Sequence, residues 1–284
     1  MLEALQFIFP PFVAAVSILV ILGYLGLHVL EREIIFIDIA LAQFAATGST
    51  VALILFHLDH HEGGMTARLF AVGFTFIAAA FFSFVSKKVA RISQETVIGV
   101  SYAIAAAATL FLLATAAGSD VHMEEMLTGS LLWASWSDII QCLIVYGAVG
   151  VFHIVFRRQF MQVSRDYKGA ERSGVNVMLW DFLFYASMGI VITFTVEFAG
   201  VLLTFSFLII PATFSAMIVR NWGSRIIVSW ILGIVVSIVG LSASFMYDTP
   251  CGPTLVSVMG FVLVVAAIIR RFIPSSEQVT TDDR

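Results

Sequence analysis

Stretches of about twenty predominantly apolar residues recur along the chain, and they limit its fold more than any other feature. A helix needs about 20 such residues to cross the hydrocarbon core of a bilayer. Sixty per cent of the 284 residues are hydrophobic and only 12% are charged, whereas soluble domains average roughly 45–50% and 25%. We therefore predict an all-α, polytopic membrane helical bundle. About nine segments qualify as spans, at roughly 10–29, 36–56, 68–86, 97–117, 138–156, 177–195, 199–219, 226–246 and 253–270.

Continuous apolarity does not distinguish a span from a re-entrant segment, so roughly eight or ten spans remain open alternatives. The basic residues favour nine. With nine alternating spans, all but one of the 15 Lys and Arg residues fall on the same side, and the exception is Arg68. Because cytoplasmic loops carry an excess of Lys and Arg, we expect the N-terminus outside and the C-terminus in the cytoplasm. We expect a single transmembrane domain over residues 1–271 and a polar cytoplasmic tail over 272–284.

The longest predicted inner loop runs from Phe156 to Gly174 and is basic with mixed charge. Its helix-compatible spacing predicts an amphipathic helix lying at the cytoplasmic surface. A loop of this size also favours a docking surface for a soluble partner.

The sequence lacks the motifs that mark several common enzyme classes. There is no G-x-x-x-x-G-K-[ST] phosphate loop, no H-E-x-x-H and no G-x-S-x-G. The two cysteines, Cys142 and Cys251, form no CxxC pair and no disulfide framework. We therefore expect neither an enzyme nor an ATPase, and no nucleic-acid partner.

Three polar residues inside predicted spans are candidates for a metal or translocation path: Asp38, Gln43 and Asp181. Ionisable residues at membrane depth are costly, and they usually face a bundle interior or an aqueous path. Residues five apart on a helix differ by about 140° around its axis, so Asp38 and Gln43 do not share one narrow face. Polar packing between helices and placement at the membrane interface remain the alternatives.

Other polar residues have simpler interpretations. Asp138 follows a Ser-Trp-Ser turn, so we expect it to cap a helix. His28 and His153 lie near predicted inner helix ends, where snorkelling or a helix-terminus role is expected.

The predicted outer loop HLDHHEGG contains His57, Asp59, His60, His61 and Glu62. Imidazole and carboxylate groups are suitable ligands for zinc and its divalent neighbours. The sequence therefore suggests outer-loop metal capture, and a plain polar hairpin loop is the alternative.

Four segments occur in an order that is typical of one transporter family. They are VLERE…ALAQFAATG, LTGSLLWASWSDI, SRDYKGAERSG followed by GVLLTFSFLIIPAT, and GLSASFMYDTPCGPT. On these segments the chain resembles the zinc, manganese and iron permease family of ATP-binding-cassette importers. The resemblance covers nearly the whole chain, and its most distinctive part is GVLL…LIIPAT joined to SFMYDTPCGP.

The resemblance implies a permease subunit in a bacterial or archaeal cytoplasmic membrane, with membrane lipid around it and a second permease subunit, most simply a homodimer. Separate cytoplasmic ATPase subunits would drive alternating access, and an extracytoplasmic metal-binding protein would deliver the cargo. It implies no permanently bound cofactor and a transported divalent metal ion, with zinc first, then manganese or iron. It also implies a segment that couples to the ATPase at about 157–176. Its coupling residues would be Ser164, Asp166, Ala170 and Gly174.

The second predicted span departs from the family pattern. Family members usually carry Asp-Ala-Leu-Ser-His there, followed five residues after the His by Gly. Registering on Gly48 places Gln43 at the His position and Ile39 at the Asp position, with Asp38 one residue early. The cargo therefore stays open. The alternatives are a chelated metal or another small solute on the same scaffold, or a stand-alone secondary transporter or ion channel using Asp38 and Asp181.

Overall fold

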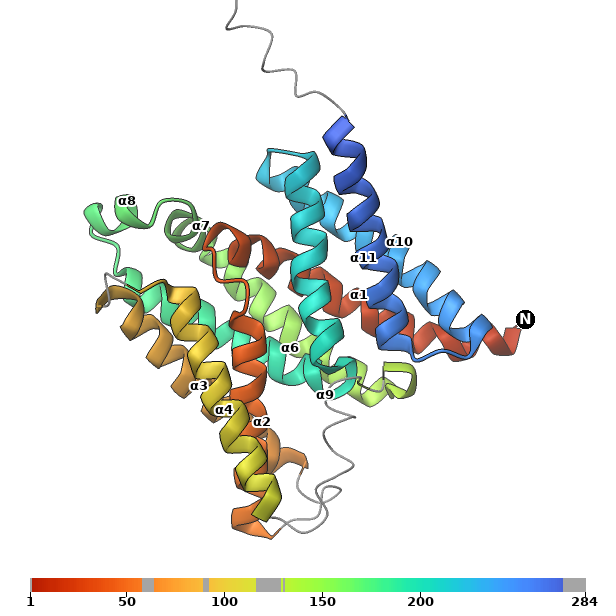
Figure 1. Cartoon of the computed structure of the whole chain (residues 1–284), viewed down its shortest axis with the longest axis horizontal. Helices are drawn as coiled ribbons and strands as arrows, with labels where there is room; N and C mark the ends of the chain where they lie inside the picture. The colour runs from red at the N-terminus through yellow and green to blue at the C-terminus, as the bar shows by residue number, and fades with distance from the viewer. Residues whose placement is uncertain (1, 58–63, 89–91, 116–128, 130, 273–284) are drawn as a thin grey trace, which may run out of the picture.

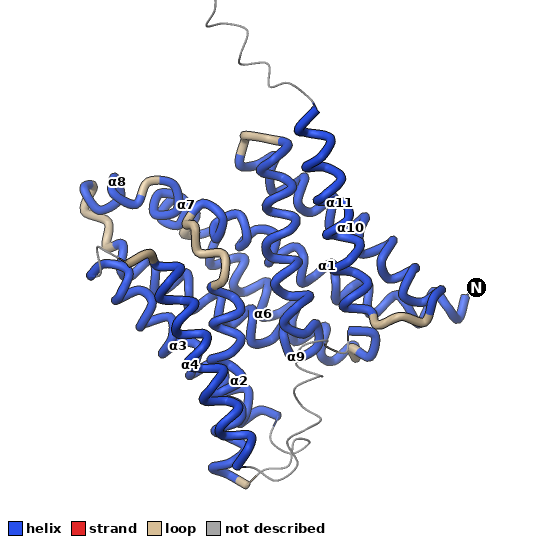
Figure 2. Tube along the Cα trace, in the orientation of Figure 1, coloured by secondary structure: helices blue, strands red, loops and turns tan. Residues whose placement is uncertain are grey.

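The computed structural model describes residues 2–57, 64–88, 92–115, 129 and 131–272, and within them it shows helices joined by short loops and no strand (Figure 2). The elements are α1 (Leu2–Glu31), α2 (Ile37–Phe56), α3 (Gly64–Lys88), α4 (Gln94–Thr115), the short 3-10 helix η1 (Leu131–Trp133), α6 (Trp136–Val155), α7 (Arg157–Arg165), α8 (Tyr167–Arg172), α9 (Val177–Ile218), α10 (Trp222–Tyr247) and α11 (Cys251–Phe272). The predicted all-α membrane bundle is confirmed: eight of these helices are long and apolar enough to cross a bilayer. The predicted tail beyond residue 272 lies outside the described residues.

The longest helix, α9, is a hairpin of two spans. Its 42 residues contain one break in helical geometry, at Gly200, where φ is 73° and ψ is 165°. Glycine tolerates this positive φ because it has no Cβ. Asp181, near the start of α9, bonds to Arg32, and Trp222, just beyond its end, contacts the ring of His28, so both ends lie beside the end of α1.

Glu197, close to the break, bonds instead to Arg68 at the other side of the bundle. The helix therefore crosses the bundle twice, as predicted for residues 177–195 and 199–219. Counting it twice gives nine crossings in the described part of the chain.

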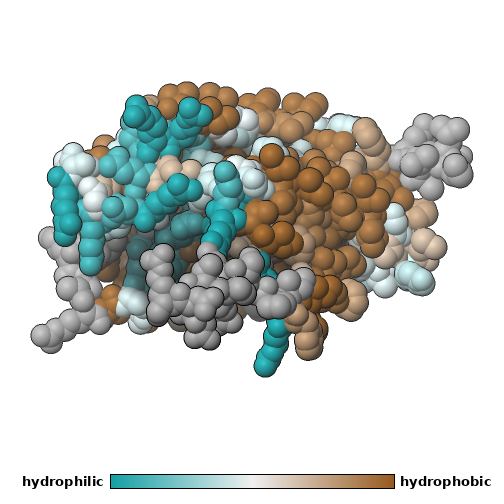
Figure 3. All heavy atoms as spheres, turned by 90° about the horizontal axis from the view of Figure 1, so that it is seen from above, coloured by the Kyte–Doolittle hydropathy of each residue, from teal (hydrophilic) through white to brown (hydrophobic). Residues whose placement is uncertain are grey.

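The crossings alternate between two faces, which we name by their charged residues. The basic face carries α7, α8, the loop before α10 and the C-terminal end of α11, and the Arg68 face carries Arg68 and the Gly200 break (Figure 1). Hydrophilic side chains gather on the side of the molecule where α7 and α8 lie, whereas the opposite flank is strongly hydrophobic (Figure 3). That the basic face is the cytoplasmic one stays a prediction from the charge pattern.

The core forms around α1 and α9. Helix α9 packs against α1, α2, α3, α6, α7, α8, α10 and α11. Along α1, Ile18, Leu22, Leu25 and Val29 recur at helical spacing and are fully buried, as expected for a stripe with a period of 3.6 residues. In contrast, α4 and α11 expose many large apolar side chains, which suits helices that face lipid.

The predicted inner amphipathic helix is two short helices instead of one. Helices α7 and α8 meet at Asp166, whose Oδ1 accepts a hydrogen bond of 2.8 Å from the Gly169 backbone N–H. Aspartate favours such an N-cap over a helix interior because its carboxylate satisfies an otherwise unpaired backbone donor. Both helices are amphipathic, with Phe160, Val163 and Ala170 buried beneath an exposed polar side.

The closest approach of α1 to α9 leaves no room for a side chain at Gly26. A Cβ built there would lie 1.9 Å from the Leu208 carbonyl oxygen. We therefore expect Gly26→Ala to lower the free energy of unfolding by about 1–3 kcal/mol, the usual cost of overpacking. The measurement is unfolding in detergent micelles.

Gly147→Ala is the matched control, because nothing lies within 4 Å of a Cβ built at that helical glycine. The control should leave stability unchanged or raise it by about 0.5–1 kcal/mol. Equal stability of the two variants would contradict the close packing of α1 on α9.

Candidate functional site

Asp38 lies in the first turn of α2 and is 2% exposed. Its Oδ1 makes no hydrogen bond to any described residue. The neighbouring α4 places a second carboxylate close by: Glu95 Oε1 accepts a hydrogen bond of 3.1 Å from the N–H of Phe36, two residues before Asp38. Glu95 Oε2 is likewise buried with no hydrogen-bond partner among the described residues. Two carboxylates thus lie near one another where α2 and α4 begin.

Gln43 is half-buried between α2 and α4. Its Nε2 donates a hydrogen bond of 2.9 Å to Thr109 Oγ1. The Thr109 hydroxyl in turn donates to the Ala105 carbonyl at 3.0 Å and lies 2.7 Å from Thr47 Oγ1. These contacts join two helices by polar groups, which is one of the roles expected from the sequence. They also orient the Gln43 amide: its nitrogen bonds to Thr109, and its oxygen therefore points away from Thr109.

Asp181 forms a buried ion pair with Arg32 at the basic face. Arg32 Nη1 lies 2.6 Å from Asp181 Oδ1, and the two side chains are only 6% and 2% exposed. The Arg32 guanidinium also lies 4.2 Å from the centroid of the Phe184 ring. The pair joins the end of α1 to the first turns of α9. The prediction that Asp181 lines the translocation path stays a prediction, but in this conformation a cation of the chain itself neutralises the carboxylate.

The same guanidinium reaches the surface helix α7. Arg32 Nε donates a hydrogen bond of 2.8 Å to Ser164 Oγ, and His28 Nδ1 lies 2.8 Å from the same oxygen. His28 Nε2 lies 3.0 Å from the Tyr24 hydroxyl, one turn further into α1. Ser164 is 5% exposed, so these bonds are screened little by water. We call Arg32, Asp181, Ser164 and His28 the buried node.

His28 and His153 do lie in the last turns of α1 and α6, as expected. They do not snorkel towards the surface, so that alternative is wrong. Both are fully buried. His153 Nε2 lies 2.8 Å from Ser187 Oγ, and its imidazole stacks on Phe160 at 4.1 Å between ring centroids. Both ring nitrogens of His28 have hydrogen-bond partners, which reduces the cost of its burial. Of the His153 nitrogens only Nε2 does, since Nδ1 is buried with no hydrogen-bond partner among the described residues.

Of the predicted coupling residues, Ser164 and Ala170 face the core, whereas Asp166 is the helix cap between α7 and α8. Gly174 ends the segment with a φ of 81°. Their role in coupling is not visible in a single chain and stays a prediction.

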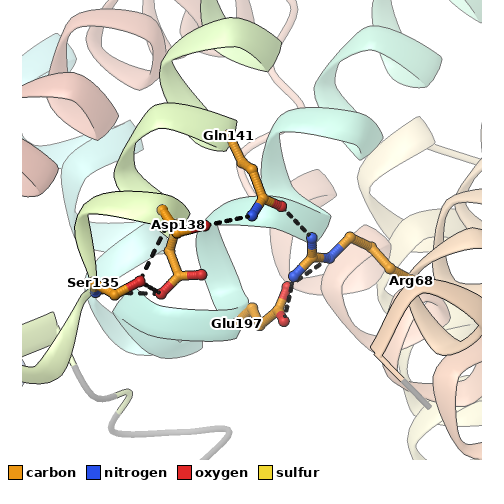
Figure 4. Close-up of polar contacts among 6 residues, drawn as sticks. Arg68, Ser135, Asp138, Gln141 and Glu197 are labelled. Carbon is orange, nitrogen blue, oxygen red and sulfur yellow. Dashed lines mark hydrogen bonds and ion pairs between the residues drawn. The ribbon is translucent and has the colours of Figure 1, made fainter. Parts of the chain in front are cut away.

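A second polar cluster lies at the Arg68 face (Figure 4). Arg68 Nε and Nη2 donate to the two carboxylate oxygens of Glu197 at 3.0 and 2.7 Å. Arg68 Nη1 donates to Gln141 Oε1 at 2.9 Å. One guanidinium from α3 therefore bonds to both α9 and α6.

A cavity of about 190 Å³ lies beside this cluster. Its lining residues come from α3, η1, α6 and α9: Arg68, Trp133, Ala134, Asp138, Gln141, Cys142, Phe194, Glu197 and Phe198. Cys142 is 3% exposed in its wall, although Trp133 at the rim is largely exposed.

Asp138 caps α6, as predicted from the Ser-Trp-Ser turn. Ser135 Oγ accepts from the Asp138 N–H at 3.3 Å, while Asp138 Oδ2 accepts from the Ser135 N–H at 3.2 Å. This reciprocal pair is a capping box, which satisfies two backbone donors at the helix N-terminus.

The predicted outer metal-capture loop is described only at His57, the C-cap of α2. Asp59, His60, His61 and Glu62 lie outside the described residues. In the described ranges no three His, Cys, Asp or Glu side chains lie close enough together to hold a metal ion.

The sequence analysis did not predict that Arg32 forms a buried ion pair or that Arg68 pairs with Glu197. Arg32 belongs to the charged VLERE stretch, which indicates a loop at a membrane surface. The available signal was Asp181, because a carboxylate one turn inside a span needs a nearby cation, and Arg32 is one of the basic residues predicted on the same side.

The fold and these sites define a multi-pass membrane protein with a basic surface segment that packs into its helical core. The profile of the ABC 3 transport family matches residues 4–270. The chain therefore belongs to the ABC 3 transport family and is a membrane permease subunit of an ATP-binding-cassette transporter, as the sequence resemblance predicted.

Individual relatives are distant. The chain is 23% identical over 258 residues to the "Manganese transport system membrane protein MntC" of Listeria monocytogenes, covering 89% of this chain and 87% of that protein. It is 25% identical over 192 residues to the "Chelated iron transport system membrane protein YfeD" of Yersinia pestis, covering 68% and 64%. Its fold is similar to a chain of the PsaBC structure from Streptococcus pneumoniae, with a TM-score of 0.78, 21% identity and coverage of 95% and 96%.

The buried node allows a direct test of the Arg32–Asp181 pair. Asp181→Asn keeps the side-chain shape but leaves the buried guanidinium without its counter-charge. We expect the free energy of unfolding to fall by about 3–5 kcal/mol, which is typical for breaking a buried ion pair. The measurement is denaturant unfolding in detergent, followed by tryptophan fluorescence.

Glu31→Gln provides the control, because the Arg225–Glu31 pair has the same kind of geometry at 2.7 Å but side chains that are 19% and 32% exposed. Exposed pairs contribute about 0–1 kcal/mol. Equal losses in the free energy of unfolding for the two variants would contradict the role of the Arg32–Asp181 pair as a buried ion pair.

Proposed function

We propose that the chain is the permease subunit of an importer for a divalent transition metal ion, with manganese preferred over iron and zinc. Family membership supports transport, and the donor chemistry of α2 supports the choice of metal. The observation that carries the proposal is the buried Asp38 carboxylate, whose Oδ1 has no hydrogen-bond partner among the described residues, one and a half turns before the Gln43 amide on the same helix.

The translocation path in this proposal follows Asp38, Gln43 and Asp181. A buried carboxylate oxygen without a hydrogen-bond donor is costly at membrane depth, and a passing cation would offset that cost at Asp38. Asp181 would become available to the ion only when the Arg32 ion pair opens. A stand-alone transporter or channel using Asp38 and Asp181 is less well supported, because the chain belongs to a family of permease subunits.

The preference for manganese differs from the zinc-first ranking that the sequence resemblance implied, and it follows from the ligand types. Carboxylate and carbonyl oxygens suit manganese, whereas imidazole suits zinc and iron. Gln43 stands where the family pattern has histidine, and its contact with Thr109 leaves the amide oxygen free to face an ion. The named relatives include a manganese and a chelated iron system, which agrees with this ranking and keeps a chelated metal as the alternative cargo.

The partners follow from the same proposal. Cytoplasmic ATPase subunits would dock on α7 and α8, where Ser164, Asp166, Ala170 and Gly174 would receive the stroke. A second permease subunit, most simply a homodimer partner, would complete the channel in a bacterial or archaeal cytoplasmic membrane. An extracytoplasmic metal-binding protein would deliver the ion to the Arg68 face, and the loop from His57 to Glu62 would help to capture it.

The ion assignment is tested by metal-dependent ATPase activity of the reconstituted complex with its binding protein. Titration with manganese, iron(II) and zinc should give half-maximal activity at the lowest concentration for manganese. Gln43→His should shift the ratio towards zinc on the order of tenfold, because it restores an imidazole at this position.

Gln43→Asn is the control, since it keeps the amide oxygen and should keep manganese first. If zinc stimulates the parent protein at the lowest concentration, the assignment to manganese is refuted. The assignment as a metal importer would still stand. A complex that no metal stimulates would contradict the importer itself.

A further inference from the structure

The Thr109 hydroxyl lies on the side of α4 that packs against α2. Thr109 is 4% exposed, and its hydroxyl donates a hydrogen bond of 3.0 Å to the carbonyl oxygen of Ala105, one turn earlier. A hydroxyl has a single proton and two acceptor lone pairs. Because the proton is used at Ala105, Thr109 can offer only lone pairs to α2.

Two side chains of α2 use these lone pairs. Gln43 Nε2 donates to Thr109 Oγ1 at 2.9 Å, and Thr47 Oγ1, one turn further along α2, lies 2.7 Å from the same oxygen. A contact this short between hydroxyls needs a proton, which then comes from Thr47. Thr109 therefore donates once and accepts twice, which uses its full hydrogen-bonding capacity.

This arrangement allows the Gln43 amide only one orientation. An amide has donors on its nitrogen and acceptor lone pairs on its oxygen. Turning it by 180° would place its oxygen against the Thr109 oxygen, with no proton between the two acceptors. Such a contact is costly where water is excluded. The amide nitrogen is consequently held at Thr109, and the amide oxygen is held on the side away from α4.

The backbone that carries Gln43 is fixed from the other side. Phe44, the next residue, contacts the ring of Phe82 on α3 at 6.2 Å between ring centroids. Helix α2 packs closely on both α3 and α4. The packing of α2 thus sets the place of Gln43, while Thr109 sets the direction of its amide oxygen.

We propose that Thr109 is a positioning residue that determines metal selectivity, because it holds the Gln43 amide oxygen towards the ion. The proposal rests on the proposed function for the contact between Gln43 and the ion. Thr109 itself does not touch the ion. A carbonyl oxygen held in place suits manganese, whereas zinc depends more on imidazole ligands. Without the Thr109 hydroxyl, the amide would turn and present its N–H groups to the cation for part of the time, and manganese would lose the most.

Binding of manganese in the absence of ATP tests this without any transport. The complex of the permease with its ATPase subunits is titrated with Mn(II), whose electron paramagnetic resonance signal changes on binding, and zinc is measured by competition. Thr109→Val keeps the shape of the side chain but removes the hydroxyl. We expect it to raise the Kd for manganese about fivefold, the scale of one hydrogen bond, and the Kd for zinc by less than about twofold.

Thr109→Ser keeps the hydroxyl and should hold the Kd for manganese within about twofold of the parent value. Thr50→Val is the matched control, because Thr50 is a buried threonine of α2 whose hydroxyl donates to the Ala46 carbonyl of the same helix. It should leave both dissociation constants unchanged. In a Gln43→Leu background there is no amide to orient, so Thr109→Val should no longer change the ratio of the two constants.

Three results would overturn the role of Thr109. One is an unchanged Kd for manganese in Thr109→Val. Another is an equal loss of affinity for manganese and zinc, which is expected if the hydroxyl only packs α2 on α4. The third is the same change of the ratio in the Gln43→Leu background, because Thr109 would then act by a different route. If the metals bind as expected but the complex imports none of them, the proposed function is refuted and the role of Thr109 in binding stands.

Discussion

The organisation of this protein depends on one guanidinium that is buried where three helices meet. Arg32 pairs with Asp181 on α9 and donates to Ser164 on α7, while the adjacent His28 bonds to the same serine oxygen. A charge in this position is tolerated only because its partners are already in place. As a result, the amphipathic surface segment is fixed to the two helices that form the core. A force applied to α7 therefore has a direct polar route into α1 and α9.

The Arg68 face is built differently from the basic face. There an accessible ion pair joins α3 to α9, and such a pair contributes little because water and salt screen it. In the proposed function, Asp38 and Gln43 on α2 would offer oxygen atoms to the ion, and Gln43 is oriented by Thr109 on α4. The described structure thus combines a buried ion pair at the basic face with an accessible ion pair at the Arg68 face.

The sequence predicted the elements of this fold better than their contacts. Nine apolar segments and the one-sided distribution of Lys and Arg were sufficient for the crossings, including the α9 hairpin, because hydropathy and length determine spans locally. The cap by Asp138 was also predictable, since its partner lies three residues away. The contacts of Arg32 and His28 were not predictable. Charged residues at the boundary of a span are expected to face solvent, and the partners of these two lie more than a hundred residues away in the sequence. The division between α7 and α8 depends on the N-cap at Asp166, which the spacing of apolar residues does not indicate.

The proposed function leads to one central claim: Ser164 would transmit the ATPase stroke through its bonds to Arg32 and His28 in the buried node. The most direct measurement is the number of metal ions transported per ATP hydrolysed by the reconstituted complex. Ser164→Ala removes both bonds to the node and should lower this ratio about fivefold or more, while the complex still assembles and hydrolyses ATP. Ser173→Ala, in the same segment, removes a hydroxyl that bonds only within it, to Gln162 and Ala170, and should leave the ratio unchanged. An unchanged ratio in Ser164→Ala would contradict the account.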